Sequence, residues 1–270
     1  MSGGLREPLD VRRRASALWL TLNRPAARNG IDLGLVAAIG SALDTAESAG
    51  DVAAVVVAAA GPVFCAGADL KLIAGLAVMP PQQAAAGLLD FLTGVGELFD
   101  RIEAFGKPVI AAVDGLALAG GLELVLACDI VIATEAARFG DAHANYGLLP
   151  GGGGSARLPR RVGESTAKYL MVTGRALPAG DLAHTDLVTV LVGAGADLQS
   201  VVDDCVGDIA AKSPKGIQVM KQLVRSGRDE APATARLGEL DALARHALSE
   251  DFAEGLRAFS EKRRPVFTGR

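Results

Sequence analysis

Two ionisable side chains, Glu123 and His143, lie in apolar or glycine-rich surroundings and are the first candidates for chemistry. Glu123 follows Gly120 and Gly121 and is the one ionisable residue in the apolar stretch LELVLA. A carboxylate among apolar groups needs a reason to be there, and catalysis is a frequent one. His143 lies between two alanines in FGDAHANYG and is one of three histidines in the chain. Because the ordinary pKa of histidine is about 6.5, His143 can act as an acid or a base at neutral pH.

Both residues also have a structural interpretation. Glutamate is favourable in the first turn of a helix, where it meets the positive end of the helix dipole. His143 could be a core residue that happens to be histidine. The remaining histidines, His184 and His246, lie in alanine- and leucine-rich helical stretches and are expected to be structural or surface residues. For Glu123 we favour the catalytic interpretation.

Two glycine-containing turns could present backbone N–H groups to an anion. The first is FCAGADL at residues 64–70, and the second is GLALAGGLEL at residues 115–124. Small residues let the backbone approach a bound oxygen, and a helix N-terminus favours negative charge. A single glycine-containing turn is more often only a tight turn between two elements. The hypothesis of an anion-binding site therefore depends on both turns together.

Alternating strands and helices position these groups. Apolar, partly β-branched runs bounded by Gly, Pro or Asp predict strands at residues 16–23, 53–60, 108–115 and 129–134. The pattern is an α/β layout of repeated strand–turn–helix units. From Leu198 to Ser260 the pattern is helical, with Ser213 as a cap before Pro214 and a basic last turn before Pro265. We predict a core over residues 1–196 and a helical oligomerisation region over 197–270.

Composition excludes several function classes. The 270 residues contain 27 Lys and Arg against 31 Asp and Glu, a net charge of −4, so the sequence indicates no nucleic-acid partner. No run reaches about 18 apolar residues and no leader pattern opens the chain, which favours a cytoplasmic protein without a membrane partner. Cys65, Cys128 and Cys205 lack CxxC spacing, so neither disulfides nor a metal site are expected.

Taken together, the motifs resemble the crotonase, or enoyl-CoA hydratase/isomerase, superfamily. The resemblance covers about Leu18 to Phe267 and is carried, in order, by LNRPAARNGID, FCAGADL, AAVDGLALAGGLELVLACDI, GLLPGGGGSARLPRRVG, TGRALPAGDLA and AFSEKRRPVF. It implies a crotonase-type spiral of strand-strand-helix repeats with an α-helical C-terminal trimerisation region. It also implies a homotrimer or homohexamer that acts on an acyl-CoA, with coenzyme A as part of the substrate and no other cofactor.

The resemblance assigns roles to individual residues. Ala68 and Gly120 match the two backbone donors of the oxyanion hole, and Glu123 matches the first catalytic glutamate of the hydratases. Loss of one such donor typically costs about 10²- to 10³-fold in rate. Arg24 is a weaker candidate for binding the anionic end of CoA. The residues assigned to CoA binding are Ala66, Asp69, Leu70, Lys71, Arg28, Phe259 and Lys262.

The sequence departs from the hydratase pattern at the second glutamate, where it has His143. In the first hypothesis, which we favour, Glu123 and His143 form an acid/base pair for hydration, dehydration or isomerisation of an enoyl-CoA. In the second, His143 activates water for carbon-carbon hydrolysis of a β-diketone or β-keto acyl-CoA. Diketone hydrolases of the superfamily add an aspartate near the following PG, where this chain has Gly151–Gly154. In the third, the protein binds acyl-CoA without catalysis.

Three neighbours of His143 are secondary candidates for substrate contact. Asp141, Asn145 and Tyr146 all lie in the same short segment. Asp141 is equally explained as a turn residue after Gly140, and Tyr146 as a core residue. The prediction for these three side chains is therefore a minor role.

Overall fold

The computed structural model describes residues 7–270 and contains two β-sheets. From β3 to β8, successive strands of the chain alternate between the two sheets. The larger sheet has the order β1-β2-β3-β5-β7-β10, with strands Leu9–Arg14, Ala17–Leu22, Ala54–Ala59, Val109–Val113, Ile130–Thr134 and Val190–Val192. The smaller sheet has the order β4-β6-β8-β9, with strands Val63–Cys65, Leu116–Leu118, Arg138–Gly140 and Ala176–Pro178.

The chain repeats a strand-strand-helix unit, as predicted. In the first unit, β1 and β2 both join the larger sheet. In the next three units one strand joins the larger sheet, the following strand joins the smaller sheet, and a helix follows. All four strands predicted from apolar runs are present, as β2, β3, β5 and β7. Their pairing is parallel, which requires a crossover between neighbours. The helices of this part are α1 (Leu33–Ser48), α2 (Leu70–Ala77), α3 (Pro81–Ala104), α4 (Gly120–Ala127), α5 (Gly154–Val162), α6 (Glu164–Thr173) and α7 (Ala179–Leu182), with 3-10 turns η1 (Pro25–Ala27) and η2 (His143–Tyr146).

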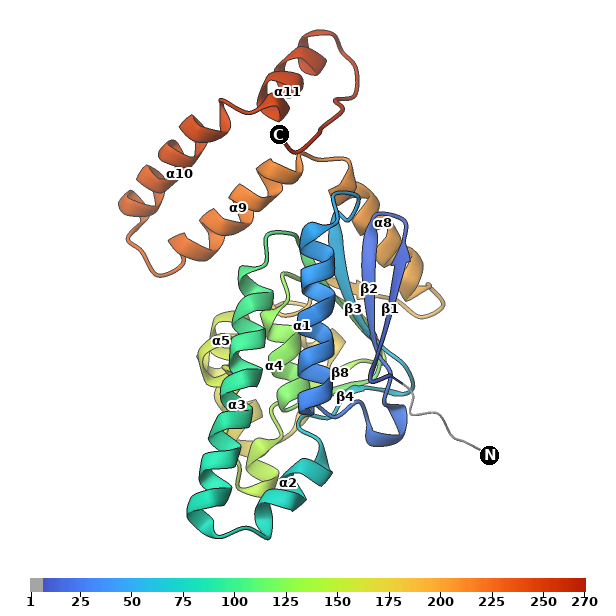
Figure 1. Cartoon of the computed structure of the whole chain (residues 1–270), viewed down its shortest axis with the longest axis vertical. Helices are drawn as coiled ribbons and strands as arrows, with labels where there is room; N and C mark the ends of the chain where they lie inside the picture. The colour runs from blue at the N-terminus through green and yellow to red at the C-terminus, as the bar shows by residue number, and fades with distance from the viewer. Residues whose placement is uncertain (1–6) are drawn as a thin grey trace.

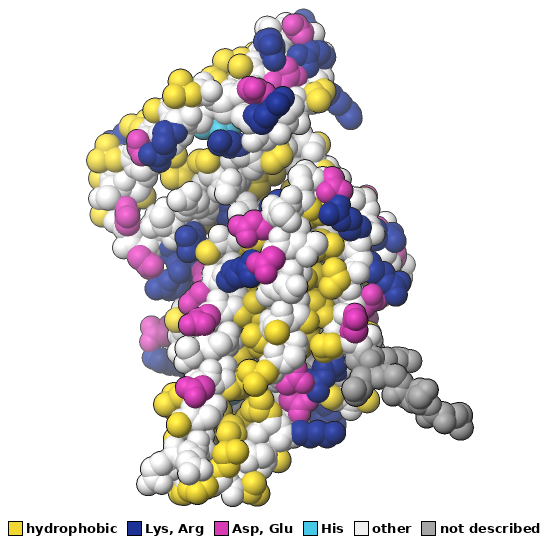
Figure 2. Space-filling view, viewed as in Figure 1, with side chains coloured by type: hydrophobic (Ala, Val, Ile, Leu, Met, Phe, Trp, Pro, Cys, Tyr) yellow, Lys and Arg dark blue, Asp and Glu magenta, His cyan; other side chains and the backbone are white. Residues whose placement is uncertain are grey.

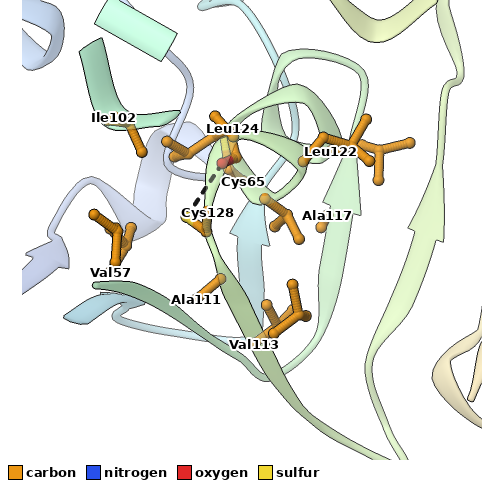
Figure 3. Packing of buried hydrophobic residues seen from close by; sticks show 14 of the residues in the cluster. Val57, Cys65, Ile102, Ala111, Val113, Ala117, Leu122, Leu124 and Cys128 are labelled. Carbon is orange, nitrogen blue, oxygen red and sulfur yellow. Dashed lines mark hydrogen bonds between the residues drawn. The ribbon is translucent and has the colours of Figure 1, made fainter. Parts of the chain in front are cut away.

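The main core lies between the sheets and helices α1, α3 and α4 (Figure 1). Every residue of α4 is buried, so this helix runs through the interior. Gly121 makes that placement possible, because a Cβ there would lie 2.2 Å from the Cys65 carbonyl oxygen. Figure 3 shows the core side chains around α4, which include Val57, Cys65, Ile102, Ala111, Val113, Ala117, Leu122, Leu124 and Cys128.

Helix α8 (Leu198–Ala210) covers the other face of the larger sheet. Its Val202 and Val206 are buried in one cluster with alternate residues of the strands, such as Val56 and Ile110. Helix α8, which was assigned from the sequence to the C-terminal helical region, therefore packs directly on the sheet. Because strand residues alternate between faces, the second apolar face also needs a cover, and α8 provides it.

Three further helices extend away from the sheets: α9 (Pro214–Gly227), α10 (Pro232–His246) and α11 (Glu250–Ser260) (Figure 1). The Ser213 cap is confirmed, since its Oγ accepts a 2.9 Å hydrogen bond from the Gly216 amide. Figure 2 shows hydrophobic side chains on the surface of this helical arm. The exposed apolar residues of the arm are Met220, Val224, Leu237, Leu240, Leu243, Leu248, Leu256 and Phe259.

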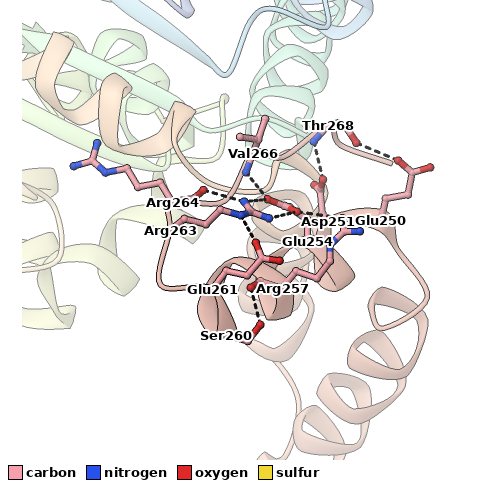
Figure 4. A network of polar contacts seen from close by, with 10 residues as sticks. All are labelled: Glu250, Asp251, Glu254, Arg257, Ser260, Glu261, Arg263, Arg264, Val266 and Thr268. Carbon is pink, nitrogen blue, oxygen red and sulfur yellow. Dashed lines mark hydrogen bonds and ion pairs between the residues drawn. The ribbon is translucent and has the colours of Figure 1, made fainter.

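The basic run after α11 is not part of a helix, which corrects the predicted basic last turn. The helix ends at Ser260, and Lys262 has a left-handed backbone conformation with φ of 54°. Arg263 folds back, with Nη2 lying 3.0 Å from Glu254 Oε2, and the Val266 amide donates to the same carboxylate (Figure 4). These contacts hold the C-terminal segment against α11. Within residues 7–270, no helix is both long and apolar enough to cross a lipid bilayer.

Candidate active site

The carboxylate of Glu123 is held in one orientation by two backbone amides. Its side chain lies in the first turn of α4, and the residue is only 3% exposed. Oε1 accepts hydrogen bonds of 2.8 Å from the amides of Gly152 and Gly154. Among the described residues nothing donates to Oε2. Because the two lone pairs of Oε1 are engaged, a proton on this carboxyl group must be on Oε2.

The glycine run that supplies these donors has a structural reason. A Cβ at Gly152 would lie 2.8 Å from the ring of Phe99 and 3.0 Å from Glu123 Oε2, and a Cβ at Gly154 would lie 3.0 Å from Oε1. Arg157 fixes the loop by donating from Nη1 to the Gly152 carbonyl at 2.8 Å. In the sequence, this run was part of a family motif and was noted for lacking an aspartate, but its contact with Glu123 was missed. The unusual succession of four glycines was the available signal.

Burial favours the neutral form of Glu123. Burial raises the pKa of Glu123 above its ordinary value, although the Gly154 and Gly152 amides and the charge of His143 act in the opposite direction. The Glu123 carboxyl group can therefore hold a proton at a pH where an exposed glutamate would have lost it. That property suits a general acid.

The backbone segments of Ala68 and Gly120 lie next to each other. Ala68 bridges to Ile31, whose carbonyl accepts from the Asp69 amide at 2.8 Å. A Cβ on Gly120 would lie 3.7 Å from the Ala68 nitrogen, and one on Gly67 would lie 3.3 Å from the Gly120 nitrogen. Within residues 7–270, neither amide donates to another protein group. The predicted pair of donors is thus close together and free to bind an oxygen.

The residue before Gly120 has a strained backbone that aims this segment. Ala119 has φ of 49° and ψ of −121°, a region that residues with a Cβ rarely occupy. Its amide donates to the Gly140 carbonyl at 3.0 Å, which ties the start of α4 to the end of β8. Strain of this kind typically costs about 1 to 3 kcal/mol and is often found at functional sites.

His143 lies at the start of η2, with its ring nitrogen Nδ1 3.0 Å from Asp141 Oδ1. The His143 side chain is 11% exposed and Asp141 is buried. Burial lowers the pKa of His143, but the hydrogen bond and charge of Asp141, together with the charge of Glu123, outweigh it and raise the pKa. Glu123 and His143 thus influence each other's charge. Asp141 forms a turn after Gly140, as the sequence indicated, because the His143 amide donates to its carbonyl at 2.8 Å, and its side chain is also the buried partner of His143.

The other neighbours of His143 have structural positions. Asn145 Nδ2 donates to the Gly174 carbonyl at 3.0 Å, which ties η2 to the end of α6. Tyr146 is 79% exposed, so its expected place in the core is wrong. His184 is exposed, and His246 lies edge-on to Phe252 with ring centroids 6.1 Å apart, as the sequence indicated.

Two of the cysteines, Cys65 and Cys128, are buried. Burial raises the pKa of the Cys65 thiol to about 12, and burial likewise raises that of Cys128 to about 12. Both are free cysteines. Because the thiolate is the nucleophilic form, neither side chain is suited to attack a thioester.

Asp69 and Arg24, both candidates for CoA binding, make contacts within the protein. Asp69 caps α2 by accepting from the Lys71 amide at 2.8 Å, and its other oxygen lies 2.7 Å from Arg24 Nη2. Arg24 also lies 3.0 Å from Asp32. Both carboxylates and the guanidinium are thereby engaged in holding the loop before α2.

The remaining residues assigned to CoA fall into two groups. Near the site, Ala66 is half-buried, and the side chains of Lys71 and Arg28 are exposed, while that of Leu70 lies outside the described part of the structure. Phe259 and Lys262 are exposed on and just after α11, which lies at the opposite end of the molecule from α2 (Figure 1). Within one chain, these two residues are therefore not brought together with Glu123.

A cavity of about 880 Å³ lies elsewhere, between α9 and the body of the molecule. Asp129, Arg161 and Lys221 are among its lining residues, and Lys221 Nζ lies 2.6 Å from Asp129 Oδ2. Neither Glu123 nor His143 lines it. Glu123 and His143 therefore lie outside this cavity.

The two alternating sheets and the paired amides define an enzyme of the crotonase superfamily. The family model for enoyl-CoA hydratase/isomerase matches residues 12–270, and the chain belongs to this family. It is 36% identical over 262 residues to 2,3-dehydroadipyl-CoA hydratase of Escherichia coli, which covers 97% of this chain and 99% of the relative.

Solved structures agree with this assignment. An enoyl-CoA hydratase from Bacillus anthracis has a TM-score of 0.88 and 31% identity, covering 97% of this chain and 100% of its own. One from Polaromonas sp. JS666 has a TM-score of 0.89 and 31% identity, covering 96% and 99%. The protein is accordingly an enzyme, a hydratase or isomerase, and not a non-catalytic binder.

Proposed function

We propose that the protein adds water to the double bond of an enoyl-CoA, with Glu123 and His143 as its acid and base. The observation that carries the proposal is the buried Glu123 carboxyl group. Its Oε1 is held by two amides, its Oε2 is free of protein donors within residues 7–270, and its charge interacts with His143. An acid and a base that share one proton can protonate one carbon while water is activated for another.

The two amides of Ala68 and Gly120 would stabilise the enolate. When water attacks the β-carbon of an enoyl thioester, negative charge moves to the thioester oxygen. Preorganised donors at that oxygen typically contribute about 10²- to 10³-fold in rate each. The proximity of the two segments and the strained Ala119 support this role.

Product analysis tests the reaction class. Wild type, Glu123→Gln and His143→Gln are incubated with crotonyl-CoA and longer trans-2-enoyl-CoA esters, and products are identified by mass spectrometry. The expected result is a gain of one water by the substrate with wild type and a loss of this activity in both variants. Full hydratase activity in either variant would remove that residue from the mechanism.

A second candidate, carbon-carbon hydrolysis, is favoured by one observation. The aspartate that accompanies histidine in diketone hydrolases is absent from Gly151–Gly154, yet Asp141 lies 3.0 Å from His143. A His143–Asp141 pair could activate water for attack on a ketone, with the enolate of the remaining thioester as leaving group. Incubation with acetoacetyl-CoA distinguishes the two, because hydrolysis of its carbon-carbon bond releases acetate and acetyl-CoA.

The proposal includes a homotrimer or a homohexamer in the cytoplasm, with CoA bound partly by Lys71 and Arg28 near the site. The exposed apolar residues of α9, α10 and α11 support association, because such a surface is costly to leave in water. In an oligomer, Phe259 and Lys262 would be available to the site of another subunit. Light scattering measures the mass, and a Lys262→Glu variant with a raised KM for CoA esters would support the shared site.

A further inference from the structure

The side chains of Asp141 and His143 form a close contact that is largely buried. Asp141 Oδ1 lies 3.0 Å from His143 Nδ1, Asp141 is 2% exposed, and the side chain of His143 is 11% exposed. Little water reaches the contact, so the partners interact more strongly than an exposed pair would.

An unusual backbone turn brings these two side chains to the same side. Ala142, between them, has a left-handed conformation with φ of 57° and ψ of −8°. The His143 amide donates to the Asp141 carbonyl at 2.8 Å and closes a tight turn. A left-handed alanine is unfavourable, so this turn persists because its surroundings hold it.

Contacts on both sides hold the turn. Before it, Phe139 is fully buried, and a Cβ at Gly140 would lie 2.7 Å from the Arg175 carbonyl oxygen, so β8 has no freedom to shift. After it, Asn145 is bonded to the Gly174 carbonyl at 3.0 Å. The backbone that carries Asp141 and His143 is thereby held on both sides.

The charged groups near the pair are few. Glu123 on α4 and Asp141 are the groups whose charges act on His143. On α6, which packs against η2, Glu164 and Lys168 form an exposed ion pair with each other. The state of the His143 ring is therefore governed by its two acidic neighbours.

An ionised aspartate can only accept a hydrogen bond, so the proton of a neutral His143 ring must be on Nδ1. Nε2 then carries the lone pair. We infer that Asp141 is a positioning residue that fixes this tautomer and makes His143 Nε2 the base that takes a proton from water, which leaves Glu123 Oε2 as the acid. The inference rests on the proposed hydration reaction and assigns the role of base to His143 and that of acid to Glu123.

The proton and electron balance is complete. Water loses a proton to His143 Nε2, and its oxygen forms a bond to the β-carbon. The π electrons of the double bond move to the thioester oxygen, which the Ala68 and Gly120 amides hold. The enolate then takes the Glu123 Oε2 proton at its α-carbon, and transfer of a proton from His143 to Glu123 restores the starting state. The net reaction is addition of one water.

The ring tautomer can be measured without any activity. The chain has only three histidines, so ¹⁵N-histidine spectra are assigned with a His143→Gln variant. Above the titration of His143, wild type should show the proton on Nδ1, and Asp141→Asn should show it on Nε2, because the new amide can donate to Nδ1. A proton on Nε2 of wild-type His143 would overturn the inference.

Kinetics provide the second readout. Asp141→Asn should lower kcat about 10²- to 10⁴-fold, the range of general base catalysis, with little change in KM. In Asp141→Asn, the acidic limb of the plot of kcat against pH should move to lower pH than in wild type, because Asp141 no longer raises the pKa of His143. Asn145→Ser, which loosens the same turn without touching the ring, should leave that limb in place.

The outcomes separate the two proposals. Water addition by wild type, with an unmoved acidic limb in Asp141→Asn, would refute the positioning role and leave the hydratase proposal intact. Absence of water addition to any enoyl-CoA, together with the Nδ1-protonated tautomer, would refute the hydratase proposal alone.

Discussion

Replacement of Glu123 separates the structural role of its carboxyl group from the chemical one. Glu123→Ala removes the acceptor of the Gly152 and Gly154 amides, both bonded at 2.8 Å. A buried donor without a partner costs about 1 to 3 kcal/mol, so the two amides together should destabilise the protein by about 2 to 6 kcal/mol. At about 2 °C or more per kcal/mol for a large domain, the melting temperature should fall by at least about 4 °C.

Glu123→Gln keeps an oxygen for both amides and should leave the melting temperature near that of wild type. The raised pKa of Glu123 adds a pH dependence. A raised pKa means that the folded state favours the protonated carboxyl group. Its stabilising contribution is present below the ordinary glutamate pKa and is lost as the pH rises through the raised value. The stability of Glu123→Gln relative to wild type should therefore increase as the pH rises through this window.

The assays are thermal unfolding at one protein concentration, over a range of pH, and crotonyl-CoA hydration. Glu123→Gln should lose about 10²- to 10⁴-fold in kcat while it stays folded. Equal melting temperatures for Glu123→Ala and wild type would show that the two amide contacts do not stabilise the site. Undiminished hydration by a folded Glu123→Gln would refute the chemical role.

Further variants test the surroundings of the site. Gly152→Ala should lower both the melting temperature and kcat, because its Cβ would lie 2.8 Å from the Phe99 ring and 3.0 Å from Glu123 Oε2. Asp69→Asn should weaken the fall of the free energy of unfolding at acidic pH, measured by urea titrations at a series of pH values. Burial raises the pKa of Asp69, but the Lys71 amide and Arg24 lower it by more, so the net pKa lies below the ordinary value. The stability that ionised Asp69 contributes to wild type is therefore lost as the pH falls through this lowered pKa. Iodoacetamide should label all three cysteines of the denatured protein, as detected by mass spectrometry. In the native protein it should spare Cys65 and Cys128, because burial raises the pKa of each thiol to about 12.

Much of the fold could be predicted from the sequence, because it depends on local patterns. The β-branched runs at β3 and β5 and the capping residue Ser213 were readable from a few neighbouring residues. The helical pattern also ended at Ser260, where α11 ends, but the course of the basic residues after Ser260 was not readable. The contact of Arg263 with Glu254, seen only in three dimensions, decides that this segment folds back.

The candidate site divides in the same way. Glu123 was singled out by its apolar surroundings, and Glu123 and His143 were proposed as a pair because they match the family's two catalytic positions. The residues that hold them were missed, since Gly152 and Gly154 contact Glu123 across about thirty positions of the chain. From sequence alone, a run of glycines indicates only a loop. The structure shows that Glu123 occupies the space that side chains at Gly152 and Gly154 would take.

The sequence alone determined the order of strands and helices, and it marked Glu123, His143 and two small-residue turns as candidates for chemistry. The order follows from hydrophobic periodicity, and the candidate roles follow from the resemblance to the family. Only the tertiary structure decided the partner of His143. Ala142 adopts a left-handed conformation that alanine rarely favours, and buried contacts on either side of the turn impose it. The contact between Asp141 and His143 depends on that imposed backbone angle, which no local preference of the residues would predict.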